Sequence, residues 1–284
     1  MHNARLMPAS LPLVETTIDG PRTKRWVLEA GACTELAACR IARVGLDDCA
    51  TPYARVRLRP AGSFFLEAVE GEGRILLDGR WQRLRSGELS MAPPRGLNAF
   101  HAVPGRRWVI AWVRCEEPPW IRPLVGAGSP VRLRAGKGEM SRVIGGLRDE
   151  WEGARDPRMV HHWIGLLHGL LQRFAQPWRG QERLWHLWEE VGREPAKPWT
   201  LSMLAARVHM SSEHLRRLCL RELGRTPVQQ LTYLRIQRAK DLLENSDDKL
   251  EAIAPAVGYL SALVFSRAFK RWVGCTPSEY RGGK

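Results

Sequence analysis

The chain has 284 residues, 44% of them hydrophobic, and a net charge of +14. This length is typical of two domains, each with its own apolar core. No apolar run approaches the length of a membrane-spanning helix, and the first residues lack the pattern of a secretory signal, so we expect a cytoplasmic protein. The positive charge favours a polyanionic partner, which by charge alone is either nucleic acid or an anionic membrane surface.

The six cysteines show no paired spacing typical of a metal or redox motif. A chain of this length and hydrophobicity does not need disulfide bonds to stabilise its core. We therefore expect ordinary reduced thiols. A redox switch among Cys33, Cys39 and Cys49 is the alternative.

Residues 1–130 are predicted to form a β domain. Short alternating runs, bounded by glycine and proline, indicate strands. They lie at residues 55–60, 63–71, 73–79, 82–87, 88–94 and 107–114. Asp78 and Gly79 tolerate the positive φ angles of a tight hairpin turn. Strands at this spacing are typical of a small barrel or sandwich.

Residues 131–195 are predicted to form a helical connector. From about residue 137 to 193, apolar residues recur with helical periodicity in three stripes. We expect these helices to pack or to dimerise, and we regard a metal cluster of His161, His162 and His168 as the minor alternative. Two prolines after residue 193 then predict a linker, because the residue before each proline is pushed out of the α region.

Residues 196–284 are predicted to be all-α and contain an internal repeat. They hold 15 Lys and Arg against 8 Asp and Glu, whereas the first 195 residues hold 29 against 22. Ala205 corresponds to Ala254, and the pair at 226–227 corresponds to Thr-Pro at 276–277. A fold with two similar units therefore accounts for the last 90 or so residues.

Each copy of the repeat has the pattern of a helix-turn-helix unit. In the first copy, Thr200 can cap one helix, and Ser211 or Ser212 can cap the next. Gly224 suits the left-handed position after that helix. In the second copy, Gly258 permits the positive φ of the turn, and Ser261 can cap the second helix.

A continuous helix from Val228 to about Asn245 is predicted between the two copies. It would be a rod of roughly 27 Å, against about 34 Å for one turn of B-DNA. The two second helices are therefore expected to enter successive major grooves on one face of the duplex.

Four motifs in this region carry a family resemblance. The chain reads IAPAVGY at 253–259, FSRAFK at 265–270 and GCTPSEYR at 274–281, and the rod has L-R-x-x-x-A-x-x-L-L from Leu234. In these motifs it closely resembles the AraC/XylS family of bacterial transcriptional regulators. The resemblance implies a tandem helix-turn-helix domain that binds double-stranded DNA.

The resemblance also implies which residues face DNA. Base contacts are expected from Glu213, Arg216, Arg217, Ala262, Leu263 and Ser266, since arginine and glutamate pair with base edges. Phosphate contacts are expected from Ser212, Arg221, Arg267, Lys270 and Arg271. Two roles stay open: Arg217 could brace the fold or hold phosphate, and Val264 could contact thymine methyl groups or belong to the core.

The second unit departs from the family pattern. Pro255 falls inside its first helix, where proline removes a backbone donor, and Ala262, Leu263 and Val264 replace polar residues. We therefore expect the first unit to specify sequence and the second to add mainly affinity.

Residues 55–115 resemble the cupin-like sensor domain found at the front of many members of this family. The stretches that carry the resemblance are 69–79, 84–89, 93–96 and His101. Metal-dependent cupins use a His-x-His pair, which is absent near residues 59–65, and one histidine is too few for a metal. We therefore expect neither a metal nor another cofactor, no catalytic residues and no enzyme.

The mouth of a barrel is a natural small-molecule site. Candidate lining residues are Phe65, Glu67, Trp81, His101, Trp108 and Trp112. Aromatic faces with a few polar groups would suit a sugar. The alternative is that the tryptophans belong to the core.

These features together predict an α+β protein. A cupin-like N-terminal β-barrel, a helical connector and an all-α tandem helix-turn-helix domain would form a ligand-responsive regulator. We expect a homodimer that binds operator DNA, and contact with RNA polymerase if it is an activator. Two alternatives are a cupin-type enzyme fused to a DNA-binding module and an architectural protein that binds any duplex.

Overall fold

The structure is a computed structural model that describes residues 13–118, 120–126, 129–134, 138–176 and 182–282. Its contacts divide the chain into an N-terminal unit, residues 1–126 with 132–175, and a C-terminal unit, residues 127–131 with 176–284. Within the described part of the chain, no helix has both the length and the apolar character that crossing a bilayer requires.

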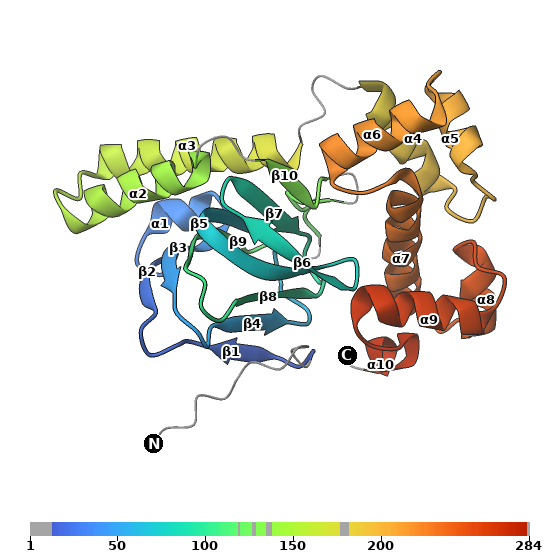
Figure 1. Cartoon of the computed structure of the whole chain (residues 1–284), viewed down its shortest axis with the longest axis horizontal. Helices are drawn as coiled ribbons and strands as arrows, with labels where there is room; N and C mark the ends of the chain where they lie inside the picture. Colours follow the sequence, from blue (N-terminus) through green and yellow to red (C-terminus); the bar gives the residue numbers. More distant parts are fainter. Residues whose placement is uncertain (1–12, 119, 127–128, 135–137, 177–181, 283–284) are drawn as a thin grey trace. The chain divides into compact units, whose positions relative to one another are not determined.

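The N-terminal unit is built on one curled antiparallel sheet, which forms a half-barrel (Figure 1). Its strands are β1 (Thr16–Ile18), β2 (Lys24–Glu29), β3 (Ile41–Cys49), β4 (Ala54–Arg57), β5 (Phe64–Leu77), β6 (Arg80–Arg85), β7 (Glu88–Ala92), β8 (Asn98–Ala102), β9 (Trp108–Cys115) and β10 (Arg132–Arg134). The main path runs β1-β4-β8-β5-β9-β3-β2. The predicted α+β class with a cupin-like front domain is confirmed.

Strand β5 is a single long strand, although two strands were predicted over its length. Its first half pairs with β7 and β9, and its second half pairs with β6 and β8. The pairing with β9 shifts register between Ala68 and Glu70. Gly71 follows with φ +71°, and a side chain there would meet the carbonyl of Arg107. Glycine thus lets β5 bend from one wall of the half-barrel into the other.

The interior of the half-barrel is filled by large side chains. Trp108, Phe64, Phe100 and Leu66 are at most 3% exposed and form one cluster. Gly73 makes room for the indole of Trp108, because a Cβ at residue 73 would lie 2.4 Å from that ring. The interior is therefore mainly a packed core.

Three helices lie on the outer face of one wall of the sheet: α1 (Thr34–Ala38), α2 (Glu139–Glu152) and α3 (Pro157–Ala175). Figure 1 shows α2 and α3 side by side. Their apolar stripes, which include Ile144 and Leu167, share a core with the β9 residue Val113. Burial of such stripes is what makes helices of this length stable.

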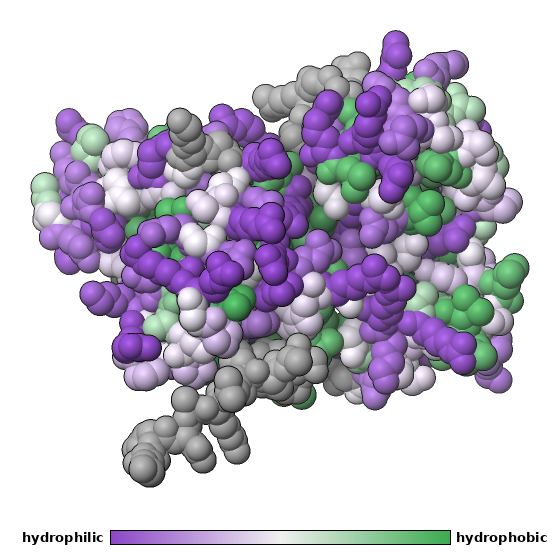
Figure 2. Space-filling view, in the orientation of Figure 1, coloured by the Kyte–Doolittle hydropathy of each residue, from purple (hydrophilic) through white to green (hydrophobic). Residues whose placement is uncertain are grey.

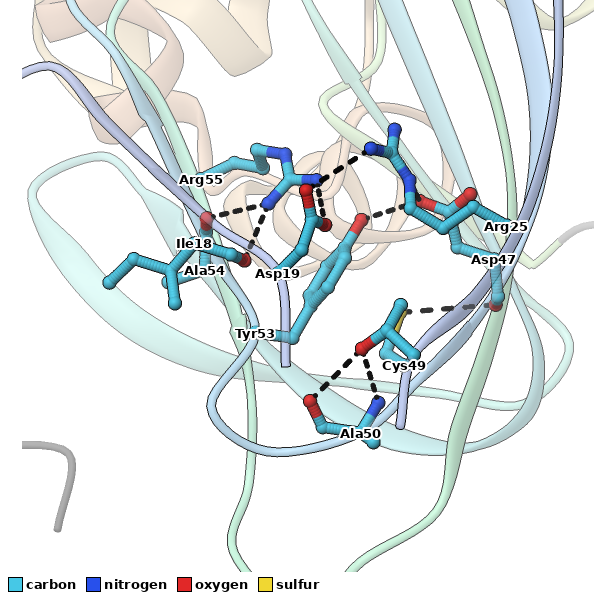
Figure 3. Close-up of polar contacts among 10 residues, drawn as sticks. Ile18, Asp19, Arg25, Asp47, Cys49, Ala50, Tyr53, Ala54 and Arg55 are labelled. Carbon is cyan, nitrogen blue, oxygen red and sulfur yellow. Dashed lines mark hydrogen bonds and ion pairs between the residues drawn. The ribbon is translucent and has the colours of Figure 1, made fainter. Parts of the chain in front are cut away.

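A polar network centred on the buried residues Asp47, Tyr53 and Arg55 lies at one side of the half-barrel, where exposed Arg25 and Asp19 join it (Figure 3). The hydroxyl of Tyr53 donates to Asp47 at 2.8 Å, and Nε of Arg25 donates to the same oxygen at 3.1 Å. Arg55, only 2% exposed, donates to Asp19 and to the carbonyls of Ile18 and Ala54. Burial raises the pKa of Asp47 above its ordinary value, and the hydrogen bonds oppose that cost.

The C-terminal unit is all-α, as predicted. Its helices are α4 (Glu182–Arg193), α5 (Leu201–Arg207), α6 (Ser212–Leu223), α7 (Pro227–Asn245), α8 (Leu250–Ala256), α9 (Ala262–Val273) and α10 (Pro277–Gly282). One core joins α4, α5 and α6, and a second joins α8, α9 and α10, with α7 contributing to both. The first helices of the expected connector thus pack on the sheet, whereas α4 packs with the first helix-turn-helix unit. A dimerising role for residues 131–195 stays a prediction.

Candidate functional site

The first helix-turn-helix unit consists of α5 and α6. The hydroxyl of Thr200 accepts from Met203 N and caps α5, and the hydroxyl of Ser211 accepts from His214 N at 3.2 Å and caps α6. His209 occupies the turn with φ +55°, and Gly224 ends α6 in the left-handed region. Each local signal in the sequence thus fixes one end of a helix.

The second unit repeats this arrangement with α8 and α9. The hydroxyl of Ser261 accepts from Val264 N at 3.3 Å and caps α9. Pro255 is exposed and lies one residue before the end of the short helix α8. The helix accommodates it because Val257 N still bonds to Ile253 O. The predicted disturbance by proline is therefore confined to the end of α8.

The rod α7 connects the two units, as Figure 1 shows. Thr226 and Gln229 form a reciprocal capping box at its start. Its 19 residues correspond to a length of about 28 Å. The structure thus places α6 and α9 near opposite ends of a rod close in length to one turn of DNA.

Arg235, in the middle of α7, holds the linker and the second turn together. Its guanidinium donates to the carbonyls of Pro195 and Lys197 at 2.9 and 3.1 Å. A Cβ at residue 258 would lie 2.7 Å from that guanidinium and would displace it, and the φ of +84° favours glycine. Arg235 was absent from the predicted site residues, although the L-R motif of the family resemblance contains it.

The predicted base-contacting residues of α6 lie together on its exposed face. Glu213, Arg216 and Arg217 are all exposed, and the side chains of Glu213 and Arg216 form an ion pair at 3.8 Å. An exposed pair of this length contributes little to stability. These side chains therefore remain available to a ligand with hydrogen-bonding groups.

The corresponding face of α9 is apolar. Leu263 is 62% exposed and Val264 is 51% exposed, while Ala262 and Ser266 are half-buried. Val264, for which a place in the core was one of two alternatives, thus lies at the surface. Leu260 in the turn is also fully exposed, and Figure 2 shows hydrophobic side chains at the surface over α8 and α9.

The predicted phosphate-contacting residues fall into two groups. Ser212 is half-buried at the start of α6, and Arg221 is exposed and pairs with Glu222 at 2.6 Å. Arg267, Lys270 and Arg271 are exposed on α9, and within the described ranges they have no ion pair. Unpaired cations of this kind suit a polyanion.

The six predicted pocket residues lie in three separate environments and do not line one pocket. Phe65 and Glu67 face the helices, and Trp108 and Trp112 fill the interior of the half-barrel. Trp81 and His101 meet edge to face at 4.8 Å, and Trp81 packs on the outer surface of the other wall. Successive side chains of a strand point to opposite faces of the sheet, and here both faces are buried.

An open groove of about 660 Å³ lies between α2 and strands β2, β3 and β9. Charged side chains dominate its lining, among them Arg25, Asp48, Arg142 and Asp149. None of the six predicted pocket residues lines this groove.

The described residues contain no group of three or more His, Cys, Asp or Glu side chains arranged to hold a metal ion. His161 and His162 have their rings 5.9 Å apart on α3. Cys33 and Cys49 are buried and Cys39 is half-buried, and burial raises the pKa of all three thiols. A raised pKa lowers the fraction of reactive thiolate.

Comparisons with known proteins agree with this geometry. A family profile described as a helix-turn-helix domain matches residues 204–283. The MmsAB operon regulatory protein of Pseudomonas aeruginosa is 28% identical over 225 residues, which cover 75% of this chain and 72% of that protein. The RCS-specific HTH-type transcriptional activator RclR of Escherichia coli is 37% identical over 125 residues, which cover 43% of this chain and 42% of that protein.

A solved structure also matches part of the chain. It is the DNA-binding domain of AdpA, described as a global transcriptional factor, in complex with a target DNA. Its sequence is 28% identical, the match covers 36% of this chain and 91% of that domain, and the TM-score is 0.35.

Proposed function

Since the chain belongs to the AraC/XylS family of transcriptional regulators, we propose that it recognises specific sites in double-stranded DNA under the control of a small molecule. The observation that carries the proposal is the pair of exposed helices, α6 and α9, near opposite ends of α7. Recognition helices of this kind enter the major groove, where each base pair presents a distinct pattern.

Helix α6 supplies the base readout in this proposal. Arg216 and Arg217 are exposed and can each donate two hydrogen bonds to guanine, while Glu213 can accept one from cytosine. The ion pair between Glu213 and Arg216 holds both groups on one face of the helix. DNA would exchange this weak contact for contacts with base edges.

Helix α9 supplies mainly affinity. Its exposed Leu263 and Val264 can contact thymine methyl groups but donate no hydrogen bonds. Arg267, Lys270 and Arg271 add charge that attracts the phosphate backbone without regard to sequence.

The N-terminal unit is the proposed effector domain. We infer that the regulator is a homodimer whose arrangement on DNA changes when the effector binds, and that it contacts RNA polymerase if it activates transcription. The distribution of the six aromatic and polar candidates over three environments weakens the case for a sugar in a single aromatic pocket.

Selection of duplexes from a random pool by the full-length protein, at fixed salt, tests the DNA-binding part. We expect a preferred site with two parts about one helical turn apart. Equal affinity for all duplexes would instead support the architectural alternative. A stoichiometric metal in elemental analysis would support the alternative of a fused cupin-type enzyme.

A further inference from the structure

One end of the half-barrel interior gathers three buried donors without acceptors. Nη1 of Arg57, Nε of Arg114 and Nδ2 of Asn98 are buried, and none has a hydrogen-bond partner in the described part of the structure. Asn98 is only 8% exposed as a whole residue. Buried donors are almost always satisfied in proteins, so three together point to a site that binds an acceptor.

The strand register places these three side chains on the interior face. Arg57 and Asn98 are direct partners across β4 and β8, and Asn98 lies two residues before the interior Phe100. Arg114 is the direct partner of the interior Phe64 across β5 and β9. Side chains of directly opposite residues share a face of the sheet.

Two phenylalanines connect the donors. The guanidinium carbon of Arg57 lies 5.4 Å from the centre of the Phe64 ring, and Phe64 stacks on Phe100 at 5.5 Å. The donors therefore stand beside an apolar wall.

Nearby carboxylates are already engaged elsewhere. Arg55, the next interior arginine on β4, is paired with Asp19. Both carboxylate oxygens of Glu117 accept, from Ser63 and from Leu124 N. Burial and the charges of Arg114 and Arg55 lower the pKa of Arg57 to about 10. The charge of Glu15, whose Oε1 accepts from Leu58 N at 2.7 Å, opposes them only in part.

We propose that this end of the half-barrel binds the carboxylate group of a small organic acid through Arg57, Arg114 and Asn98, and that this acid is the effector. That the acid acts as the effector rests on the proposed function, whereas the binding of a carboxylate does not. A carboxylate has two oxygens that accept several hydrogen bonds and pair well with guanidinium groups. Phe64 and Phe100 would pack against the organic part. A neutral sugar would bring no negative charge to offset the two guanidinium groups.

The test measures the thermal midpoint of the full-length protein with matched probes. Benzoate is compared with benzamide, and propionate with propionamide, with inorganic phosphate as a control for anions in general. We expect at least one carboxylate to raise the midpoint by about 3 °C or more, and the amides and phosphate to have no effect. Arg57→Met should abolish the shift, whereas Arg85→Gln, the matched variant of an exposed arginine on β6 that pairs with Glu72, should keep it.

The thermal midpoint of the ligand-free variant is a second readout, and it should change in the opposite direction to that expected for an arginine with a structural role. Without ligand, Arg57→Met removes an uncompensated buried charge, so its midpoint should rise above that of the unmodified protein. A lower midpoint for ligand-free Arg57→Met would show that the guanidinium already has a partner, such as water, and would overturn the proposal. So would equal shifts with carboxylates and amides, or no shift with either carboxylate.

Binding of the selected duplex separates this inference from the proposed function. If the unmodified protein prefers its site but does not respond to carboxylates, only the inference fails. If it has no preferred duplex, the proposed function fails, whatever the midpoints show. We expect Arg57→Met to bind the duplex with an affinity that no longer changes when the carboxylate is added.

Discussion

The Oε2 atom of Glu67 accepts a hydrogen bond of 2.7 Å from the backbone nitrogen of Ser141, a residue 74 positions later in the chain. Ser141 lies in the first turn of α2, and the residue before that helix, Gly138, has no side chain to cap it. A carboxylate on β5 therefore does what an N-cap residue normally does. Glu67, predicted to line a ligand pocket, instead joins the sheet to α2.

We expect Glu67→Ala to lower the free energy of unfolding of the N-terminal unit by about 1–2 kcal/mol, as for the loss of a helix cap. Denaturation in urea, followed by circular dichroism, measures the change. Glu70→Ala is the control, because Glu70 is exposed and its ion pair with Arg107 lies on the surface. A loss for Glu67→Ala no larger than that for Glu70→Ala would remove the capping role.

The same carboxylate predicts a dependence on pH. Burial raises the pKa of Glu67 above its ordinary value of 4.5, so the folded state binds the proton more tightly than the unfolded chain. As the pH rises from 4.5 through the pKa of the folded state, Glu67 ionises and the free energy of unfolding decreases. Glu67→Gln keeps an accepting oxygen and does not titrate.

We expect the stability of Glu67→Gln relative to the unmodified protein to increase between about pH 4 and about pH 7. Urea unfolding at several pH values in this range measures it. A constant difference, or one that moves in favour of the carboxylate, would mean that the start of α2 stabilises the ionised form more than burial disfavours it.

Several ends of the C-terminal helices could be predicted to within about one residue, because their signals are local. Thr200, Ser261 and Gly224 each determine the chain near their own position through a side-chain acceptor or a positive φ. The exposure of Val264 could not be predicted, since both of its possible faces on α9 carry apolar residues.

The partners of the strands could not be predicted in the same way. Phe65 and Phe64 point to opposite faces of β5, and both faces are buried, one under α2 and α3 and one inside the half-barrel. A strand buried on both sides has no alternation of polar and apolar residues from which to assign a face. Strand β4 does alternate, but its arginines face the interior: Arg57 lies opposite Asn98 of β8, whereas Val56 packs on the other face of the sheet.

We expect Gly258→Ala to destabilise the second helix-turn-helix unit by at least about 1 kcal/mol, because a left-handed position disfavours a side chain. Its Cβ would also displace the Arg235 guanidinium from the linker carbonyls. Gly165→Ala is the control: Gly165 is in the middle of α3, and a Cβ there meets nothing within 4 Å. That substitution should stabilise by roughly 0.5–1 kcal/mol. Thermal unfolding of both variants distinguishes the two effects, and equal changes would contradict the role of Gly258.

The redox alternative predicts fast modification of Cys33, Cys39 or Cys49. Because burial raises the pKa of these thiols, we expect slow alkylation by iodoacetamide in the folded protein, with half-buried Cys39 reacting before the other two. Mass spectrometry after timed quenching measures each site, and alkylation in denaturant gives the reference rate. A folded-state rate for Cys49 equal to that reference would restore the redox hypothesis.

The two recognition helices differ in the chemistry of their exposed faces, and this difference predicts different effects on DNA binding. Arg216→Ala should cost about 1–3 kcal/mol at one base position of the preferred site and relax the preference there. Arg267→Ala should weaken binding to all duplexes alike and reduce the slope of log affinity against log salt by about 1.

Fluorescence anisotropy with the preferred duplex and its single-base variants, at several salt concentrations, measures both effects. Arg43→Gln, far from these helices in the sequence and on β3, is the matched loss of one exposed arginine and should leave both quantities unchanged. If Arg216→Ala relaxes the sequence preference no more than Arg267→Ala does, the readout is shared between the units. In that case the apolar face formed by Leu263 and Val264 would have to discriminate bases through thymine methyl groups alone.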